Sequence, residues 1–125
     1  MDVDYTSVDF SPSFKVCDSI IDKAKKTACF RATMRQEIAK SLATFSVKVK
    51  KSVDETIIVT ITIQSNKEVK LSSIKASDSL YLQIPNLKEM IEKSIAELPE
   101  IYPAIKRSIP VTTEYKLPIS IKLEN

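Results

Sequence analysis

The last part of the chain alternates inward-type and outward-type residues more regularly than any other segment. In VTTEYKLPISIKL, residues 111–123, the odd positions hold Val, Thr, Tyr, Leu, Ile, Ile and Leu, and the even positions are mostly polar or charged. A period of two kept over thirteen residues predicts a β-strand with one buried and one wet face. Any fold for this chain must therefore give a long strand a hydrophobic layer on one side only.

Pro118 lies inside this strand, although proline cannot donate a ladder hydrogen bond. Proline is tolerated at an edge strand or a bulge, where its missing N–H would face away from a neighbour. It either blunts an exposed edge against aggregation or limits the register of a partner strand added there. The physics of the sequence leaves both interpretations open.

Three further strands are predicted upstream. The β-branched run ETIIVTITIQ, residues 55–64, alternates inward and outward residues after a turn at residues 52–55. A hairpin connection at residues 65–68 follows, in which Asn66 is the residue best suited to positive φ. The next strand shifts from odd to even apolar positions, which indicates a bulge near Ser72 and Ser73. Residues 45–49 also alternate and predict a short half-exposed strand.

Two helices are predicted. Phe30, Met34, Ile38 and Leu42 recur every four residues and indicate a helix over residues 31–43, preceded by a weakly helical segment from a possible cap at Asp18.

The second helix begins after Pro85 and ends before Pro99. Asn86 with Glu89 forms a capping-box pattern at its start. Pro103 and Pro110 predict an extended connection to the final strand.

This order of elements predicts an α+β fold, a three- to four-stranded antiparallel sheet with two helices packed on one face. Residues 1–16 are expected to form an irregular N-terminal lead-in and residues 17–125 a single domain, because 125 residues suffice for one core and are short for two. The N-terminal segment is acidic and mixed, unlike a signal peptide, and no stretch has the roughly 18 to 20 apolar residues of a membrane span.

Histidine and glycine are both absent from the sequence. Without histidine the chain lacks the usual general base and the commonest metal ligand. Without glycine it lacks phosphate-cradling loops. We therefore expect no enzyme activity, no cofactor and no metal site. The formal net charge of +3 comes mainly from scattered lysines, which indicate a solvated surface and no nucleic-acid partner.

Residues 98–125 resemble the end of the TonB C-terminal domain family. The resemblance is carried by Pro103-Ala104 after a helix, by the basic pair Lys106-Arg107, and by the run Leu117-Pro118-Ile119-Ser120-Ile121-Lys122-Leu123. The central hairpin, residues 55–77, is similar to that of the family in length and alternation. Two cysteines before a helix are similar to a variant found in flavobacterial TonB-like proteins.

The resemblance implies a non-enzymatic interaction domain of the periplasm or cell envelope, in a family that serves energy transduction for transport. Its mechanism would be strand addition of a peptide from an outer-membrane receptor or envelope protein at the C-terminal edge strand. Contact with a membrane would run only through a segment outside this chain, and a homodimer through the same edge is allowed. The predicted partner-binding residues are Val111, Thr112, Thr113, Glu114, Tyr115, Lys116, Leu117 and Ser120.

The chain departs from the family at two places. Ala43-Thr44-Phe45 stands where the family usually has Tyr-Pro, and Ser65-Asn66-Lys67 stands where its turn usually contains Asp-Gly. The first departure favours an alternative function, a structural envelope domain that keeps the fold, has lost energy transduction and self-associates. A nucleic-acid binder using the lysines of residues 46–51 is a third hypothesis.

Cys17 and Cys29 are the only two cysteines. A continuous helix between them would separate their Cα atoms by about 18 Å, whereas bridged Cα atoms lie within about 7 Å. A helix starting at Asp18 and a disulfide therefore exclude each other. Two buried thiols would suit a cytosolic protein, but the exported location that the resemblance implies favours a disulfide. We expect the disulfide, closing a small loop before the first long helix.

Overall fold

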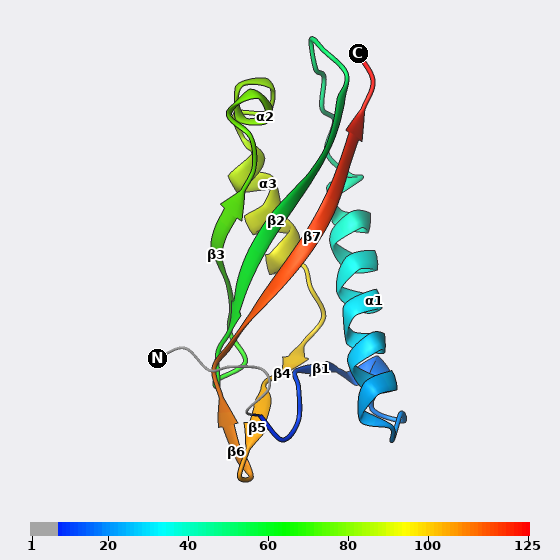
Figure 1. Cartoon of the computed structure of the whole chain (residues 1–125), viewed down its shortest axis with the longest axis vertical. Coiled ribbons are helices and arrows are strands. Elements are labelled where there is room, and N and C mark those ends of the chain that lie inside the picture. The colour runs from blue at the N-terminus through cyan, green and yellow to red at the C-terminus, as the bar shows by residue number, and fades with distance from the viewer. Residues whose placement is uncertain (1–7) are drawn as a thin grey trace.

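A three-stranded antiparallel sheet forms the centre of the protein, and a computed structural model describes it for residues 8–125 (Figure 1). The strand order is β3 (Val69–Lys75), β2 (Val53–Ile63) and β7 (Thr113–Leu123). β2 pairs with β7 over its whole length, from Val53 opposite Leu123 to Ile63 opposite Thr113. Together with the helices, this sheet confirms the predicted α+β class.

The hairpin between β2 and β3 closes without glycine. Lys67 takes the positive φ of 76°, where Asn66 was expected to take it. Asn66 instead accepts a hydrogen bond from the Glu68 N–H through its side-chain oxygen, at 3.0 Å. The ladder then shifts register, with Thr60 opposite Ser73 and Ile61 opposite Leu71, so that Ser72 is an extra residue on β3. The predicted bulge is confirmed.

The first helix, α1 (Lys23–Leu42), combines the two helical segments of the prediction. It begins at Lys23 because Asp22, and not Asp18, accepts the Lys25 N–H in its carboxylate at 2.9 Å. A helix from Asp18 is therefore wrong. Cys29 lies within α1 and is bridged to Cys17, which confirms the expected disulfide; the two Cα atoms are 6.0 Å apart.

Two helices follow β3. The short α2 (Asp78–Gln83), which was not predicted, is capped by Ser77, whose hydroxyl accepts a hydrogen bond from the Leu80 N–H at 3.1 Å. α3 (Leu87–Ala96) begins after Asn86 as predicted, but the Asn86 side chain makes no capping hydrogen bond, so the capping-box prediction is wrong.

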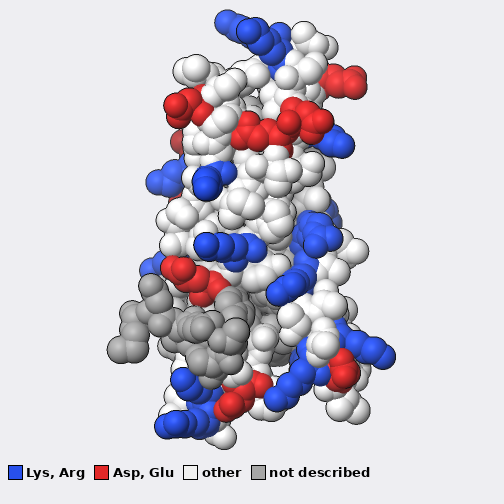
Figure 2. Space-filling view, viewed as in Figure 1, with Lys and Arg blue, Asp and Glu red and all other residues white. Residues whose placement is uncertain are grey.

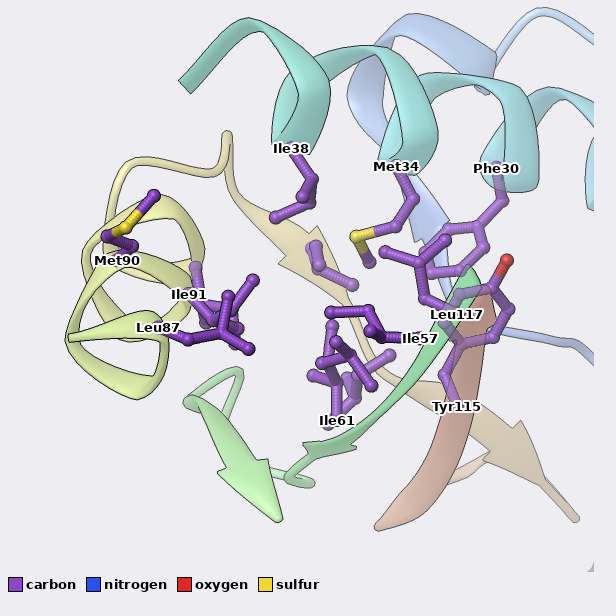
Figure 3. Close-up of a cluster of buried hydrophobic side chains, with 14 of the residues drawn as sticks. Phe30, Met34, Ile38, Ile57, Ile61, Leu87, Met90, Ile91, Tyr115 and Leu117 are labelled. Carbon is purple, nitrogen blue, oxygen red and sulfur yellow. The ribbon is translucent and has the colours of Figure 1, made fainter. Parts of the chain in front are cut away.

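The helices α1 and α3 cover one face of the sheet, and the core lies between these layers (Figure 1). Figure 3 shows Phe30, Met34 and Ile38 of α1 pointing toward the sheet, where they meet residues such as Ile57 and Leu117. Leu87 and Ile91 of α3 enter the same cluster from the other helix. The alternation of β2 and β7 therefore supplies the buried face that the sequence predicted.

The segment between α1 and β2 differs from the prediction. Residues 45–49 form no strand, although Phe45, Val47 and Val49 are partly buried against the core and their neighbours are exposed. β2 then begins at Val53, so a turn over residues 52–55 is also wrong. Alternation here reflects one-sided burial of an extended segment without ladder partners.

The start of the described chain is more regular than the expected lead-in, of which residues 1–7 lie outside the described part. β1 (Ser13–Phe14) pairs with β4 (Ile101–Tyr102), and a 3-10 turn, η2 (Lys15–Cys17), follows. Phe14 is 1% exposed and stacks on Phe30, with ring centroids 5.1 Å apart. This segment therefore closes one side of the core.

A second hairpin occupies the connection that was predicted to be simply extended. β5 (Ala104–Lys106) pairs with β6 (Ile109–Val111), and Arg107 and Ser108 both have positive φ, 51° and 65°. Two such residues between paired strands form the primed turn that suits a tight hairpin. Within residues 8–125, no helix is both long and apolar enough to cross a membrane.

Candidate partner-binding edge

The direction of the backbone groups of β7 follows from the hairpin on the far side of β2. The Gln64 N–H donates to the Glu68 carbonyl at 2.8 Å, so even-numbered residues of β2 direct their backbone groups toward β3. Successive residues of a strand point these groups to opposite sides. The odd-numbered residues of β2 therefore bond to the odd-numbered residues of β7, and the even-numbered residues of β7 face outward.

Pro118 belongs to the outward set. It lies opposite Ile58, a residue that directs its backbone groups toward β3. The N–H that proline lacks would have pointed away from the sheet, so the ladder between β2 and β7 loses no bond. This parity explains how the longest alternating strand tolerates a proline.

The outer edge of β7 offers unpaired backbone groups on both sides of that proline. Among residues 8–125, β2 is the only strand that pairs with β7. The outward N–H groups belong to four exposed residues, Glu114, Lys116, Ser120 and Lys122. Pro118 divides them into two pairs of donors, so an added strand finds two short segments and not one continuous edge.

The predicted partner-binding residues do not all share this edge. Val111 lies in β6, opposite Ala104, and the Thr112 hydroxyl accepts the Ser65 N–H at 3.1 Å. Thr113, Tyr115 and Leu117 are buried and direct their backbone groups toward β2.

Only Glu114, Lys116 and Ser120 of the predicted set lie on the outer edge, and Lys122, which the prediction omitted, belongs with them. If the direction of the hydrogen bonds to β2 had been known, the even-numbered positions of the strand would have identified this subset.

Two arginines of α1 place positive charge beside the first half of the edge. Burial raises the pKa of Tyr115 above its ordinary value of 10.0, and the charges of Arg31 and Arg35 act on the same phenol in the opposite direction. Both arginines belong to α1, and the Tyr115 ring packs edge-on against Phe30 of the same helix, with centroids 5.2 Å apart. A chain added beside Lys116 would meet this positive field.

Thr113 opens β7 with a buried hydroxyl. The residue is 1% exposed, and its Oγ1 has no hydrogen-bond partner.

Among residues 8–125, no three Cys, Asp or Glu side chains gather closely enough to hold a metal ion. The outer edge of β7 itself offers main-chain hydrogen-bonding groups flanked by charged side chains.

Comparison with known protein families, with curated proteins and with solved structures gave no match to this chain. The resemblance to the TonB C-terminal domain stays a prediction that rests on the residues quoted for it.

Proposed function

We propose that the chain is a non-enzymatic interaction domain of the cell envelope that binds an extended peptide of a protein partner by strand addition to β7. The observation that carries this proposal is the outer edge of β7, an eleven-residue strand. No strand among residues 8–125 pairs with this edge. In strand addition, main-chain hydrogen bonds supply affinity and alternate side chains supply specificity.

The half of the edge before Pro118 is the better site for the peptide. Its outward N–H groups are those of Glu114 and Lys116, and Arg31 and Arg35 add positive charge beside it. An incoming strand with an acidic side chain facing α1 would gain from that field, and like charge would be disfavoured. We therefore expect the domain to prefer extended peptides that carry an acidic residue.

The disulfide supports a location in the cell envelope, because it indicates an oxidising compartment. The Cys17–Cys29 disulfide is of the kind that persists outside the reducing cytosol. The periplasm or the cell envelope provides such an environment, and it would also bring the domain to envelope proteins that carry extended segments.

Self-association through the same edge is the second candidate. If two copies of β7 pair antiparallel about Pro118, Glu114 of each copy lies opposite Lys122 of the other, which is a favourable charge pair. The two prolines then face each other, and the central pair loses both its hydrogen bonds. This arrangement suits the alternative of a structural, self-associating envelope domain.

A proline substitution tests strand addition directly. Lys116→Pro removes an outward N–H and leaves the bonds to β2 in place, whereas Lys116→Ala removes only the side chain. We expect peptides selected from a random display library against the wild-type domain to bind Lys116→Ala well and Lys116→Pro at least about tenfold more weakly, which corresponds to the loss of one or two main-chain bonds. Circular dichroism checks that both variants are folded.

Equal binding of selected peptides by Lys116→Pro and Lys116→Ala would contradict the proposal. Amide hydrogen exchange of Lys116 and Ser120 at increasing protein concentration distinguishes self-association from strand addition of a peptide. Protection that rises with concentration indicates a second copy at the edge, and protection that appears only with peptide indicates an edge that is open in the free domain.

A further inference from the structure

Exposed large apolar side chains gather at one end of the molecule. Among the described residues there are five of them, and four lie in segments at the end opposite the C-terminus (Figure 1). These four are Phe10 (53% exposed), Val16 (70%), Ile21 (96%) and Ile109 (62%). The fifth, Leu82, is 81% exposed and lies in α2 at the other end. We call the surface formed by residues 9–26 and 104–111 the basic end.

The segments of the basic end are fixed to one another. The N–H groups of Asp9 and Phe10 donate to the Ile105 carbonyl at 2.9 and 3.0 Å, and the Arg107 N–H donates to the Asp9 carboxylate at 2.7 Å. The disulfide ties the loop that carries Ile21 to α1. The apolar side chains therefore project from segments that are held in place, and a surface that binds them need not order a flexible loop first.

Positive charge surrounds these side chains. The basic end carries six basic side chains against three acidic ones, and Figure 2 shows lysine and arginine on both sides of the lower end of the molecule. The basic residues are Lys15, Lys23, Lys25, Lys26, Lys106 and Arg107. Two of the acidic residues, Asp9 and Asp22, are engaged by backbone N–H groups within the end itself.

We propose that the basic end docks on an anionic lipid membrane. Apolar side chains that protrude singly from several segments can enter the boundary between headgroups and acyl chains, while lysines around them contact negative headgroups. Lys23 already lies over the Phe10 ring at 4.8 Å, so the two kinds of group stand side by side. The membrane contact therefore involves the described chain itself, and not only a segment outside it as the resemblance implied.

Vesicle co-sedimentation tests the proposal. We expect the wild-type protein to sediment with vesicles of phosphatidylcholine that contain one third phosphatidylglycerol, to stay in solution with pure phosphatidylcholine, and to be released as salt is raised. Absence of binding to the anionic vesicles at low salt, or equal binding to both kinds, would overturn it.

Matched variants locate the contact. Ile21→Ser is expected to weaken vesicle binding about tenfold, because that side chain leaves the interface. Lys25→Glu should weaken it at least about fivefold through lost headgroup attraction. Leu82→Ser, which removes the exposed apolar side chain of the other end, should change nothing. A loss with Leu82→Ser equal to that with Ile21→Ser would mean nonspecific adsorption and would reject the docking geometry.

The absence of tryptophan from the sequence gives a second, independent readout. Ile21→Trp and Leu82→Trp each introduce a single tryptophan at an exposed position, which can be excited selectively above the absorption of tyrosine. We expect the emission of Ile21→Trp to shift to the blue on addition of anionic vesicles and that of Leu82→Trp to stay unchanged. A blue shift of Ile21→Trp that instead follows protein concentration without vesicles would assign the basic end to a second copy of the chain, against the proposal.

Discussion

Two neighbouring threonines at the junction of β6 and β7 differ in the hydrogen bonding of their hydroxyl groups. The Thr112 hydroxyl accepts the Ser65 N–H, while the buried Thr113 hydroxyl has no partner. An unsatisfied buried polar group costs stability, whereas a made hydrogen bond contributes to it. We expect Thr113→Val to raise the free energy of unfolding by about 1 kcal/mol, and Thr112→Val to lower it by about 1 kcal/mol. Urea unfolding measures both, and equal signs would contradict this assignment.

The carboxylate of Glu55 makes the free energy of unfolding depend on pH in the acidic range. Hydrogen bonds from the Ser77 hydroxyl at 2.6 Å and the Ser77 N–H at 2.8 Å hold the pKa of Glu55 below its ordinary value of 4.5. Because the folded pKa is the lower one, the stabilisation is present above the ordinary pKa and is lost as pH falls through the folded pKa.

We therefore expect Glu55→Gln to be less stable than the wild type at neutral pH, and the difference to shrink as pH falls below 4.5. Urea unfolding over this pH range checks the trend, with Asp54→Asn as a control for a neighbouring charge. A difference that stays constant with pH would show that the hydrogen bonds to Ser77 do not favour the charged form.

At the scale of elements, the disulfide fixes where α1 meets the rest of the chain. It closes a loop between residues twelve positions apart and joins η2 to the second turn of the helix. By loop entropy, opening it should lower the free energy of unfolding by about 3 kcal/mol. We expect dithiothreitol to have this effect on the wild type and no effect on the Cys17→Ser, Cys29→Ser double variant, as measured by urea unfolding. Insensitivity of the wild type would mean that the loop stays closed without the bond.

The elements also show which sequence signals suffice. β2, β7 and the buried face of α1 were predicted because their periods of two and near four residues match the burial that each element requires. Residues 45–49 have the same alternation but no ladder, since alternation reports burial and not pairing. Arg107 and Ser108 form a primed turn without the glycine or asparagine that signals one, so the hairpin of β5 and β6 was missed.

The candidate edge was only partly predictable for a related reason. The alternation in the sequence located the strand and placed the side chains of Glu114, Lys116 and Ser120 on its solvent-exposed face. It could not tell that the ladder ends at Thr113, because Val111 continues the alternation while pairing with Ala104 in another hairpin. Which backbone groups face outward depends on the register against β2, and that register is set by tertiary packing.

At the scale of the whole molecule, the sheet depends on the last residues of the chain. β7 pairs with β2, which lies 50 to 70 residues earlier in the sequence, and contributes Tyr115 and Leu117 to the core. Deleting residues 113–125 would uncover Ile57 and Ile61 and remove the longest ladder. We expect the shortened chain to lose cooperative urea unfolding, whereas deletion of Asn125 alone should keep it. Retained cooperativity in the shortened chain would mean that the helices, β2 and β3 form a sufficient core.

The position of β7 between the two ends of the molecule also has a mechanical consequence. β7 runs along the long axis of the molecule and ends at the C-terminus, far from the basic end (Figure 1). Residues 104–111 of the basic end continue through Thr112 into Thr113, so a pull on the C-terminus against a hold at those residues would run along the covalent backbone of β7. An extended strand has little slack along its backbone, so the domain would act as a stiff link between a partner at the basic end and a partner at the C-terminus.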